Sequence, residues 1–317
     1  MRIATFKLKD GADPTTRAGL VAGDSVIDLA ALPGRGDAGS LGGGCDTLSI
    51  IRSFQDLRVR LDEMAALDDG RGGLPAERYG LDRVQLCAPV ERPGKIICLA
   101  GNYREHITES GYAAPGQADV ITQQLFLKPS TCITGDGEEI VVEHNNVAVG
   151  WETELAVVIG RRGKHIPAGE AYDHVFGYTI LNDVSERRLN SRLENRRKRE
   201  LDAFFDWLAG KWFDTFAPCG PWIVTADEIP DPHELDIRLT VNGQLRQQGS
   251  TRDMIFGVPE QIAYASSIMT LEPGDIISTG TPAGAGLGGD TSLRDGDELV
   301  CEIEKIGKLR NKVRCLN

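Results

Sequence analysis

Two glutamates that stand two residues apart offer the clearest chemistry in the sequence. Glu152 and Glu154 lie in the strand-like run 151–159, and on a strand such residues project from one face. Adjacent carboxylates repel each other unless a cation lies between them. A third carboxylate, Asp183, follows the next strand-like run, 176–182. Because no Cys or His stands at ligand spacing, the three acids favour Mg²⁺ or Mn²⁺ over zinc. The alternative is an exposed edge with both glutamates in water.

Two further segments could supply acid-base chemistry. His106 and Glu109 stand three residues apart in a predicted short helix, where the carboxylate can orient the imidazole. This pairing would make His106 a general base that acts on water, although a solvated histidine beside an acid is the simpler alternative. Lys211 lies among aromatic and apolar residues, so it either reaches out to solvent or holds an anion.

Short strand-like runs bounded by Gly or Pro must position these residues. They occur throughout the chain and are not separated by regular long helices, which favours an α+β, mainly β architecture over a doubly wound sheet. Pro89 and Pro93 mark a linker. We therefore expect a small N-terminal domain over residues 1–85 and a main domain over residues 86–317. Helical spacing of apolar residues predicts helices beginning near Leu48, across 189–208 and across 259–269.

Composition narrows the class of protein. The chain has 317 residues and a net charge of −12, which is unusual for a nucleic-acid or membrane-surface binder. No apolar run approaches the roughly 20 residues of a membrane span, and the first residues do not resemble a signal peptide. Seven cysteines without a C-x-x-C spacing indicate reduced thiols. We expect a soluble, cytoplasmic protein with no nucleic-acid or membrane partner.

Seven segments occur in an order that resembles the fumarylacetoacetate hydrolase family, from about Lys95 to the end of the chain. They are KIICLAGNYREH, LFLKPST, WETELAVVIG, VFGYTILNDVSER, GKWFDTFAPCGPWIVT, VNGQLRQ and LEPGDIISTGTPAGAG. The resemblance implies a mixed β-roll catalytic domain at the C-terminal side of a small N-terminal α+β domain. It also implies a homodimer.

The resemblance assigns roles to particular residues. It implies that Glu152, Glu154 and Asp183 hold Mg²⁺ or Mn²⁺, and that His106 and Glu109 activate water as in the acylpyruvase-like branch. Lys211 matches a lysine that faces the substrate. The expected substrate-binding residues are Arg187, Lys128, Asn190, Thr281 and Tyr103. The chain departs from the family pattern where Arg188 replaces an expected Asp and Asn190 an expected Gln.

These roles predict a metal-dependent hydrolase that cleaves a C–C bond in a 2,4-dioxo acid. The substrate would be an acylpyruvate-like small molecule, possibly a dicarboxylate, cleaved to pyruvate and a carboxylic acid during catabolism of aromatic or sugar acids. The alternatives within the family are a decarboxylase of an oxaloacetate-like acid and an isomerase or hydratase of a 2-oxo acid. An alternative of another class is a binding protein with a structural metal, whose basic helix contacts nucleic acid or an acidic partner.

A basic segment lies between Asp183 and Lys211. Residues 187–200 contain seven basic and two acidic residues, a local charge of +5. One interpretation is a helix packed through Leu189, Leu193, Leu201 and Phe204. The other is a lid whose arginines attract a substrate with a second, distal carboxylate, with Arg196, Arg197 and Arg199 as its steering residues.

Overall fold

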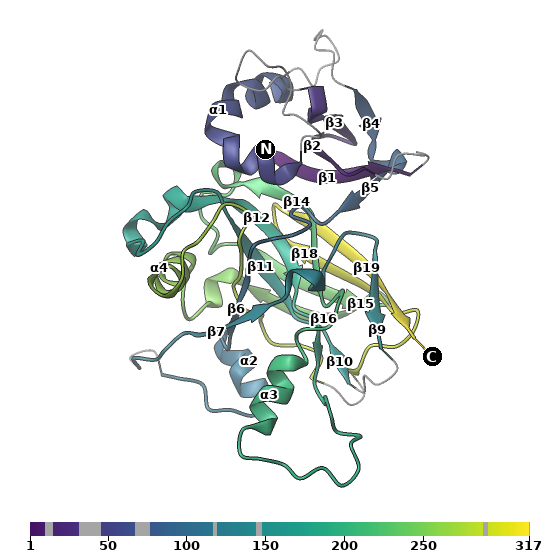
Figure 1. Cartoon of the computed structure of the whole chain (residues 1–317), viewed down its shortest axis with the longest axis vertical. Coiled ribbons are helices and arrows are strands. Elements are labelled where there is room, and N and C mark those ends of the chain that lie inside the picture. The colour runs from purple at the N-terminus through teal and green to yellow at the C-terminus, as the bar shows by residue number, and fades with distance from the viewer. Residues whose placement is uncertain are drawn as a thin grey trace.

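The computed structural model describes residues 1–9, 15–31, 46–66, 77–116, 119–143, 148–287 and 291–316. Its α-helices are α1 (Thr47–Ala66), α2 (Arg104–Glu109), α3 (Asp202–Ala209) and α4 (Val258–Ile268). Short 3₁₀ helices cover Leu29–Ala31, Leu81–Arg83, Ser130–Cys132, Ala168–His174, Ala226–Glu228 and Thr251–Asp253. The fold is mixed α+β with mainly strands, which confirms the predicted class (Figure 1).

One large sheet runs through the molecule. In sheet order its strands are β4 (Arg78–Gly80), β3 (Ser25–Asp28), β2 (Arg17–Ala22), β1 (Arg2–Leu8), β14 (Ala217–Thr225), β12 (Val175–Asn182), β11 (Thr153–Ile159), β17 (Ile276–Ser278), β6 (Ile96–Ala100) and β7 (Gln124–Lys128). Two further strands pair with members of this row, β5 (Val84–Cys87) with β1 and β8 (Ile133–Thr134) with β14.

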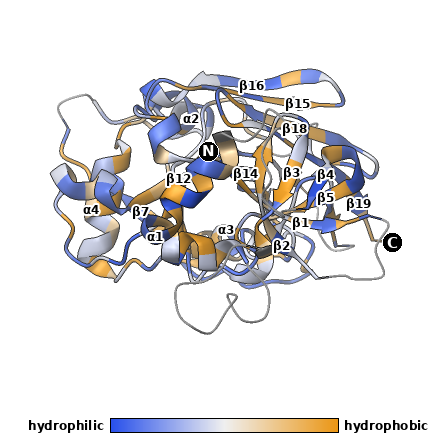
Figure 2. Ribbon diagram, turned by 90° about the horizontal axis from the view of Figure 1, so that it is seen from above, coloured by the Kyte–Doolittle hydropathy of each residue, from blue (hydrophilic) through white to orange (hydrophobic). Residues whose placement is uncertain are grey.

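Two smaller sheets complete the strands of the described residues. The first has the order β16 (Gln244–Ser250), β15 (Asp236–Val241), β18 (Glu298–Ile303), β19 (Gly307–Cys315) and β9 (Glu139–Val142). The second pairs β10 (Val149–Gly150) with β13 (Ser185–Glu186). Figure 2 shows hydrophobic colouring along β12 and β14, whereas the hairpin of β15 and β16 alternates between hydrophobic and hydrophilic.

Strand β11 is buried on both faces. Leu155 and Val157 enter one hydrophobic cluster, and Ala156 and Val158 enter another. A strand covered on both sides needs an almost continuous apolar run, which TELAVVI supplies after its first two residues. The two glutamates at its start are therefore carried into the interior.

The N-terminal strands and α1 lie at one end of the molecule, above the larger part in Figure 1. Asp46 caps α1 by accepting a hydrogen bond from the Ser49 N–H (2.7 Å), and Ile50, Leu57 and Leu61 face the sheet. The large sheet is continuous across this end because β1 pairs with β14. The expected domain boundary near residue 85 stays a prediction.

The expected helix across residues 189–208 is wrong in its first half. Only Asp202–Ala209 is helical, and the preceding residues form turns. Asn190 and Asn195 adopt positive φ angles of 61° and 56°, which a helix cannot include. Leu193 and Leu201 are more than half exposed, so the packing expected of this segment is also wrong.

No helix of the described residues is long and apolar enough to cross a membrane. The described cysteines are free thiols, in agreement with the expectation of reduced cysteines, and Cys45 lies outside the described residues.

A close approach between β12 and β14 gives a test of the fold. A Cβ atom added to Gly177 would lie 2.2 Å from the Val224 carbonyl oxygen, so we expect Gly177→Ala to destabilise the protein by about 1–3 kcal/mol. Urea unfolding followed by circular dichroism measures the change. Gly169→Ala is the matched control, because nothing lies within 4 Å of its added Cβ. Equal unfolding midpoints for the two variants would contradict the packing described here.

Candidate active site and metal centre

The three predicted metal ligands lie together in the interior. Strands β11 and β12 are antiparallel with Thr153 opposite Asn182, so Glu152 and Asp183 are adjacent across the strand ends. The Asp183 N–H donates to the Glu152 carbonyl (2.8 Å), and the Glu152 N–H donates to Asn182 Oδ1 (2.9 Å). One carboxylate oxygen from each of Glu152, Glu154 and Asp183 lies within 4.8 Å of the others, and all three residues are buried. The alternative of an exposed edge is wrong.

Glu152 is held by two cationic side chains. Arg187 Nη2 donates to its Oε1 (2.6 Å), and Lys211 Nζ donates to its Oε2 (2.7 Å). Burial alone would raise the pKa of Glu152, but Arg187, Lys211 and His106 outweigh it and hold that pKa well below its ordinary value. Glu152 is therefore an anion in the folded protein.

Asp183 is held by two buried lysines. Lys128 Nζ donates to Asp183 Oδ1 (2.6 Å) and to the Val184 carbonyl (3.0 Å), and Lys211 Nζ donates to Asp183 Oδ2 (2.6 Å). Burial lowers the pKa of Lys211, but Asp183 and Glu152 outweigh it and hold that pKa above its ordinary value. The Lys211 ammonium also lies over an aromatic ring of β7 and one of α3, at 5.3 and 5.7 Å from the ring centroids. The sequence left open whether Lys211 reaches solvent or holds an anion. Because Lys211 is buried among carboxylates, it does not reach solvent.

Glu154 differs from the other two acids because it has no ion pair within the described part of the chain. Its Oε2 accepts hydrogen bonds from Ser278 Oγ (2.6 Å) and from the Gly280 N–H (2.8 Å). Burial, together with the charges of Asp183 and Glu152, raises the pKa of Glu154 to about 8. A divalent cation beside Glu154 would favour its ionised form.

The residues present fit a hard divalent cation. The donors are three buried carboxylates, and oxygen donors of this kind suit Mg²⁺ and Mn²⁺. Hydrogen bonds from neighbouring groups fix the orientation of each carboxylate, as in metal centres whose ligands are held from outside. The cluster Glu152, Glu154 and Asp183 is thus an acidic metal site.

The predicted acid-base pair faces this site from α2. His106 Nε2 lies 3.9 Å from Glu152 Oε1, and His106 Nδ1 lies 3.5 Å from Glu109 Oε2. The second distance is longer than a hydrogen bond, and such contacts often tighten only when substrate is bound. Both oxygens of Glu109 accept from the Gly284 N–H (3.0 and 3.1 Å), which orients its carboxylate.

Arg187 and Lys128 join the cluster directly, and the other expected substrate-binding residues lie in different surroundings. Tyr103 is buried, and its hydroxyl has no hydrogen-bond partner among the described residues. The Thr281 hydroxyl donates to the Thr153 carbonyl (2.9 Å) and accepts from Gln247 Nε2 (2.8 Å), so its bonding is internal. Asn190 is exposed, and its amide donates to Asp206 on α3 (2.8 Å), outside the buried cluster.

The basic segment forms ion pairs with acidic residues of α3. Arg196 forms ion pairs with Asp206 and Asp202, and Arg199 Nε donates to Asp202 Oδ1 (2.9 Å). Two of the three arginines proposed to steer substrate are therefore engaged within the chain. Arg197 is exposed.

Several residues of the site were missed by sequence reasoning. Ser278 and Gly280 hold Glu154, and Gln247 joins the loop after β17 to β11 by accepting from the Thr153 N–H (2.9 Å). Gly280 and Ser278 belong to the quoted segment ISTGTP, and Gln247 belongs to VNGQLRQ. The motifs pointed to these segments, but only the folded chain shows which atoms they contact.

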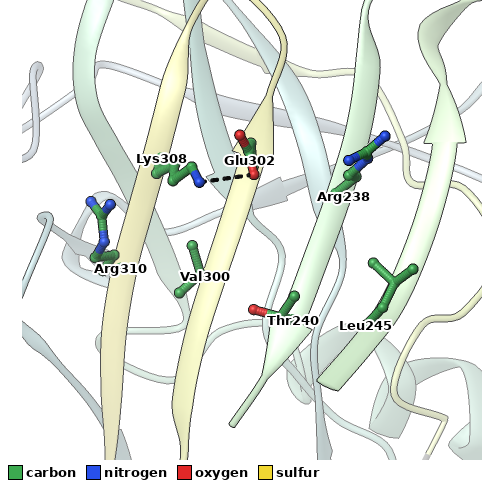
Figure 3. A pocket seen from close by; sticks show the side chains of 7 residues that line it. All are labelled: Arg238, Thr240, Leu245, Val300, Glu302, Lys308 and Arg310. Atoms are coloured by element: carbon green, nitrogen blue, oxygen red, sulfur yellow. Dashed lines mark ion pairs between the residues drawn. The ribbon is translucent and has the colours of Figure 1, made fainter. Parts of the chain in front are cut away.

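An open pocket on the outer face of the five-stranded sheet is a separate feature (Figure 3). Its lining residues come from β15, β16, β18 and β19, and one ion pair, Lys308 with Glu302 at 3.3 Å, crosses it. None of the predicted site residues lines it.

Comparison with known proteins agrees with this geometry. The chain is 41% identical over 253 residues to a mitochondrial oxaloacetate tautomerase of Homo sapiens, a match that covers 78% of this chain and 76% of the relative. It is 36% identical over 321 residues to a mitochondrial oxaloacetate tautomerase of Xenopus laevis, covering 99% of this chain and 90% of the relative. The crystal structure of maleylpyruvate hydrolase from Sphingobium with manganese(II) and pyruvate covers 100% of both chains, with a TM-score of 0.76 and 33% identity.

A family model described as fumarylacetoacetate (FAA) hydrolase C-terminal matches residues 95–314. This match spans the carboxylate cluster, the pair His106 and Glu109, and Lys211. The protein is therefore an enzyme of the fumarylacetoacetate hydrolase family.

Proposed function

We propose that the protein interconverts the keto and enol forms of an oxaloacetate-like 2-oxo acid with Mg²⁺ or Mn²⁺ as cofactor. The observation that carries the proposal is the convergence of three groups on Glu152. A buried carboxylate cluster, the Lys211 ammonium and the His106 imidazole meet at this one side chain. Conversion of keto to enol needs one proton removed from the carbon next to the keto group and one proton added to the keto oxygen, and the site supplies one base and a cationic setting for the charge that develops.

His106 is the group that moves the proton. In its neutral form one ring nitrogen is an acceptor, and Nε2 faces the carboxylate cluster, so it takes a proton from the carbon next to the keto group. Glu109 lies beside Nδ1 and stabilises the imidazolium that results. The imidazolium then gives the proton to the enolate oxygen, which forms the enol, and the same two transfers in reverse convert the enol to the keto form.

Lys211 donates to the oxygen on which negative charge grows. Its position among buried acids keeps it protonated, so it acts as a hydrogen-bond donor and not as a base. Arg187 and Lys128 orient the carboxylates of Glu152 and Asp183 through their hydrogen bonds. When bound, a divalent metal at the cluster acts as a Lewis acid that polarises a keto oxygen.

Hydrolytic cleavage of a 2,4-dioxo acid is the second candidate, and one observation favours it. The approach of Glu109 to His106 is the arrangement that would activate a water molecule. The related Sphingobium protein that holds manganese(II) and pyruvate is named a maleylpyruvate hydrolase, whereas the relatives from Homo sapiens and Xenopus laevis are named oxaloacetate tautomerases. We place tautomerisation first because the relatives named oxaloacetate tautomerases are more similar in sequence, at 41% and 36% identity, than the hydrolase at 33%. A homodimer and a cytoplasmic location are further expectations of the family resemblance and of the sequence.

A direct assay separates the candidate reactions. Enol-oxaloacetate decay is followed by ultraviolet absorbance, pyruvate release from oxaloacetate reports decarboxylation, and pyruvate release from acetylpyruvate reports hydrolysis. Each is measured with Mn²⁺, with Mg²⁺ and with excess chelator. We expect fast, metal-dependent enol decay without pyruvate release. If the enzyme released pyruvate rapidly from acetylpyruvate and did not accelerate enol decay, the order of the two candidates would be reversed.

Removal of one carboxylate should weaken metal binding strongly. Changing groups that only orient metal ligands costs about 10–100-fold in affinity, so we expect Glu154→Gln and Asp183→Asn to weaken Mn²⁺ binding by more than about 100-fold. Isothermal titration calorimetry measures this. Glu170→Gln, at an exposed acid, is the control and should bind like the wild type. Unchanged Mn²⁺ affinity in Glu154→Gln would show that the cluster is not the metal site.

His106 and Glu109 should act as a unit. General-base catalysis is worth about 10²–10⁴-fold, so we expect His106→Asn and Glu109→Gln each to lower kcat, and the double variant to lose little more than His106→Asn alone. Steady-state kinetics at saturating Mn²⁺ measures the three values. His165→Asn, at an exposed histidine, should leave kcat unchanged. Losses that multiply in the double variant would mean that the residues work independently.

A further inference from the structure

A single peptide unit connects the metal site to the start of α2. The Thr279 carbonyl and the Gly280 N–H belong to the same planar unit. Its N–H donates to Glu154 Oε2 (2.8 Å), and its carbonyl accepts from Asn102 Nδ2 (2.7 Å). Hydrogen bonds in such a chain polarise one another, so the bond from Asn102 strengthens the bond to Glu154.

The Asn102 side chain has no freedom to adopt another orientation. It is 1% exposed, and Nδ2 makes a second bond to the Phe256 carbonyl (3.0 Å) while Oδ1 accepts from the Phe256 N–H (2.8 Å). Reversal of the amide would direct Oδ1 at two carbonyl oxygens. The hydrogen bonds therefore identify which side-chain atom of Asn102 is the oxygen and which is the nitrogen. Both hydrogens of the amide nitrogen donate to carbonyl oxygens.

The backbones around this side chain are packed closely. Gly280 has a φ of +90°, and a Cβ atom added there would lie 2.7 Å from Asn102 Cβ. Gly280 thus serves two purposes, since it adopts a conformation that other residues avoid and it lets the chain pass directly against Asn102.

Helix α2 is tied to the same loop at both ends. It begins two residues after Asn102, and at its other end Glu109 accepts from the Gly284 N–H. The helix that carries His106 and the loop that holds Glu154 are therefore one connected body, with Asn102 at the joint nearest to the metal site.

We propose that Asn102 is a positioning residue that sets the place of the metal ligand Glu154 relative to the base His106. It touches neither substrate nor metal and acts through the peptide between Thr279 and Gly280. The inference deepens the proposed function and rests on it for the role of His106, but its effect on Glu154 can be measured without any substrate.

The test compares two buried amides that donate to the same carbonyl. Gln261 Nε2 also donates to the Phe256 carbonyl (2.8 Å) and is equally buried, but it makes no contact with Thr279. Asn102→Leu and Gln261→Met each replace an amide by an apolar group of similar size. We expect Asn102→Leu to weaken Mn²⁺ binding about 10–100-fold in calorimetry and to lower kcat at saturating Mn²⁺ more than it changes KM. Gln261→Met should match the wild type in Mn²⁺ affinity and kcat, even if its melting temperature falls.

A third variant covers the case in which Asn102→Leu does not fold. Asn102→Ala removes the donor to Thr279 and adds no atoms beside Gly280. Wild-type Mn²⁺ affinity in a folded Asn102 variant, or equal losses in Gln261→Met, would overturn the proposal. If the wild type turned over none of the 2-oxo acids, the proposed function would fail, while the Mn²⁺ titrations would still decide the role of Asn102.

Discussion

Burial of three carboxylates in one place is the constraint on which the rest of the structure depends. Such a group is stable only if cations and hydrogen-bond donors surround it, because breaking one buried ion pair costs about 3–5 kcal/mol. Lys128 ends β7, Lys211 follows α3, and Arg187 follows β13. These cations are far apart in sequence, so the charges balance only when the segments that carry them have come together in the fold.

The order of strands in the large sheet achieves this convergence. Strand β11 lies between β12, which leads to Asp183, and β17, which ends at Ser278 and leads into the loop that binds Glu154. Strand β6 lies on the other side of β17, and the chain that leaves it enters α2. The metal ligands, the groups that orient them and the base thus arise at the ends of four neighbouring strands.

The sequence predicted the parts of the site that depend on local geometry. The spacing of Glu152 and Glu154 on a strand, the acid after the next strand and the short helix of His106 are all local patterns, and the structure contains each of them. The sequence did not predict the turns at 187–201, because their form depends on positive φ angles at two asparagines and on ion pairs with Asp202 and Asp206. Nor could it predict the contacts of Asn102, whose partners lie more than 150 residues away.

The pairing of β1 with β14 also affects the tendency of the protein to associate with other copies of itself. Strand β14 pairs on its other side with β12, so without β1 the part of β14 around Ile223 and Val224 would present unpaired N–H and carbonyl groups to solvent. Exposed edges of this kind add strands from other chains. The N-terminal strands therefore protect the sheet that holds the metal site from edge-to-edge association with other chains. This role is separate from catalysis.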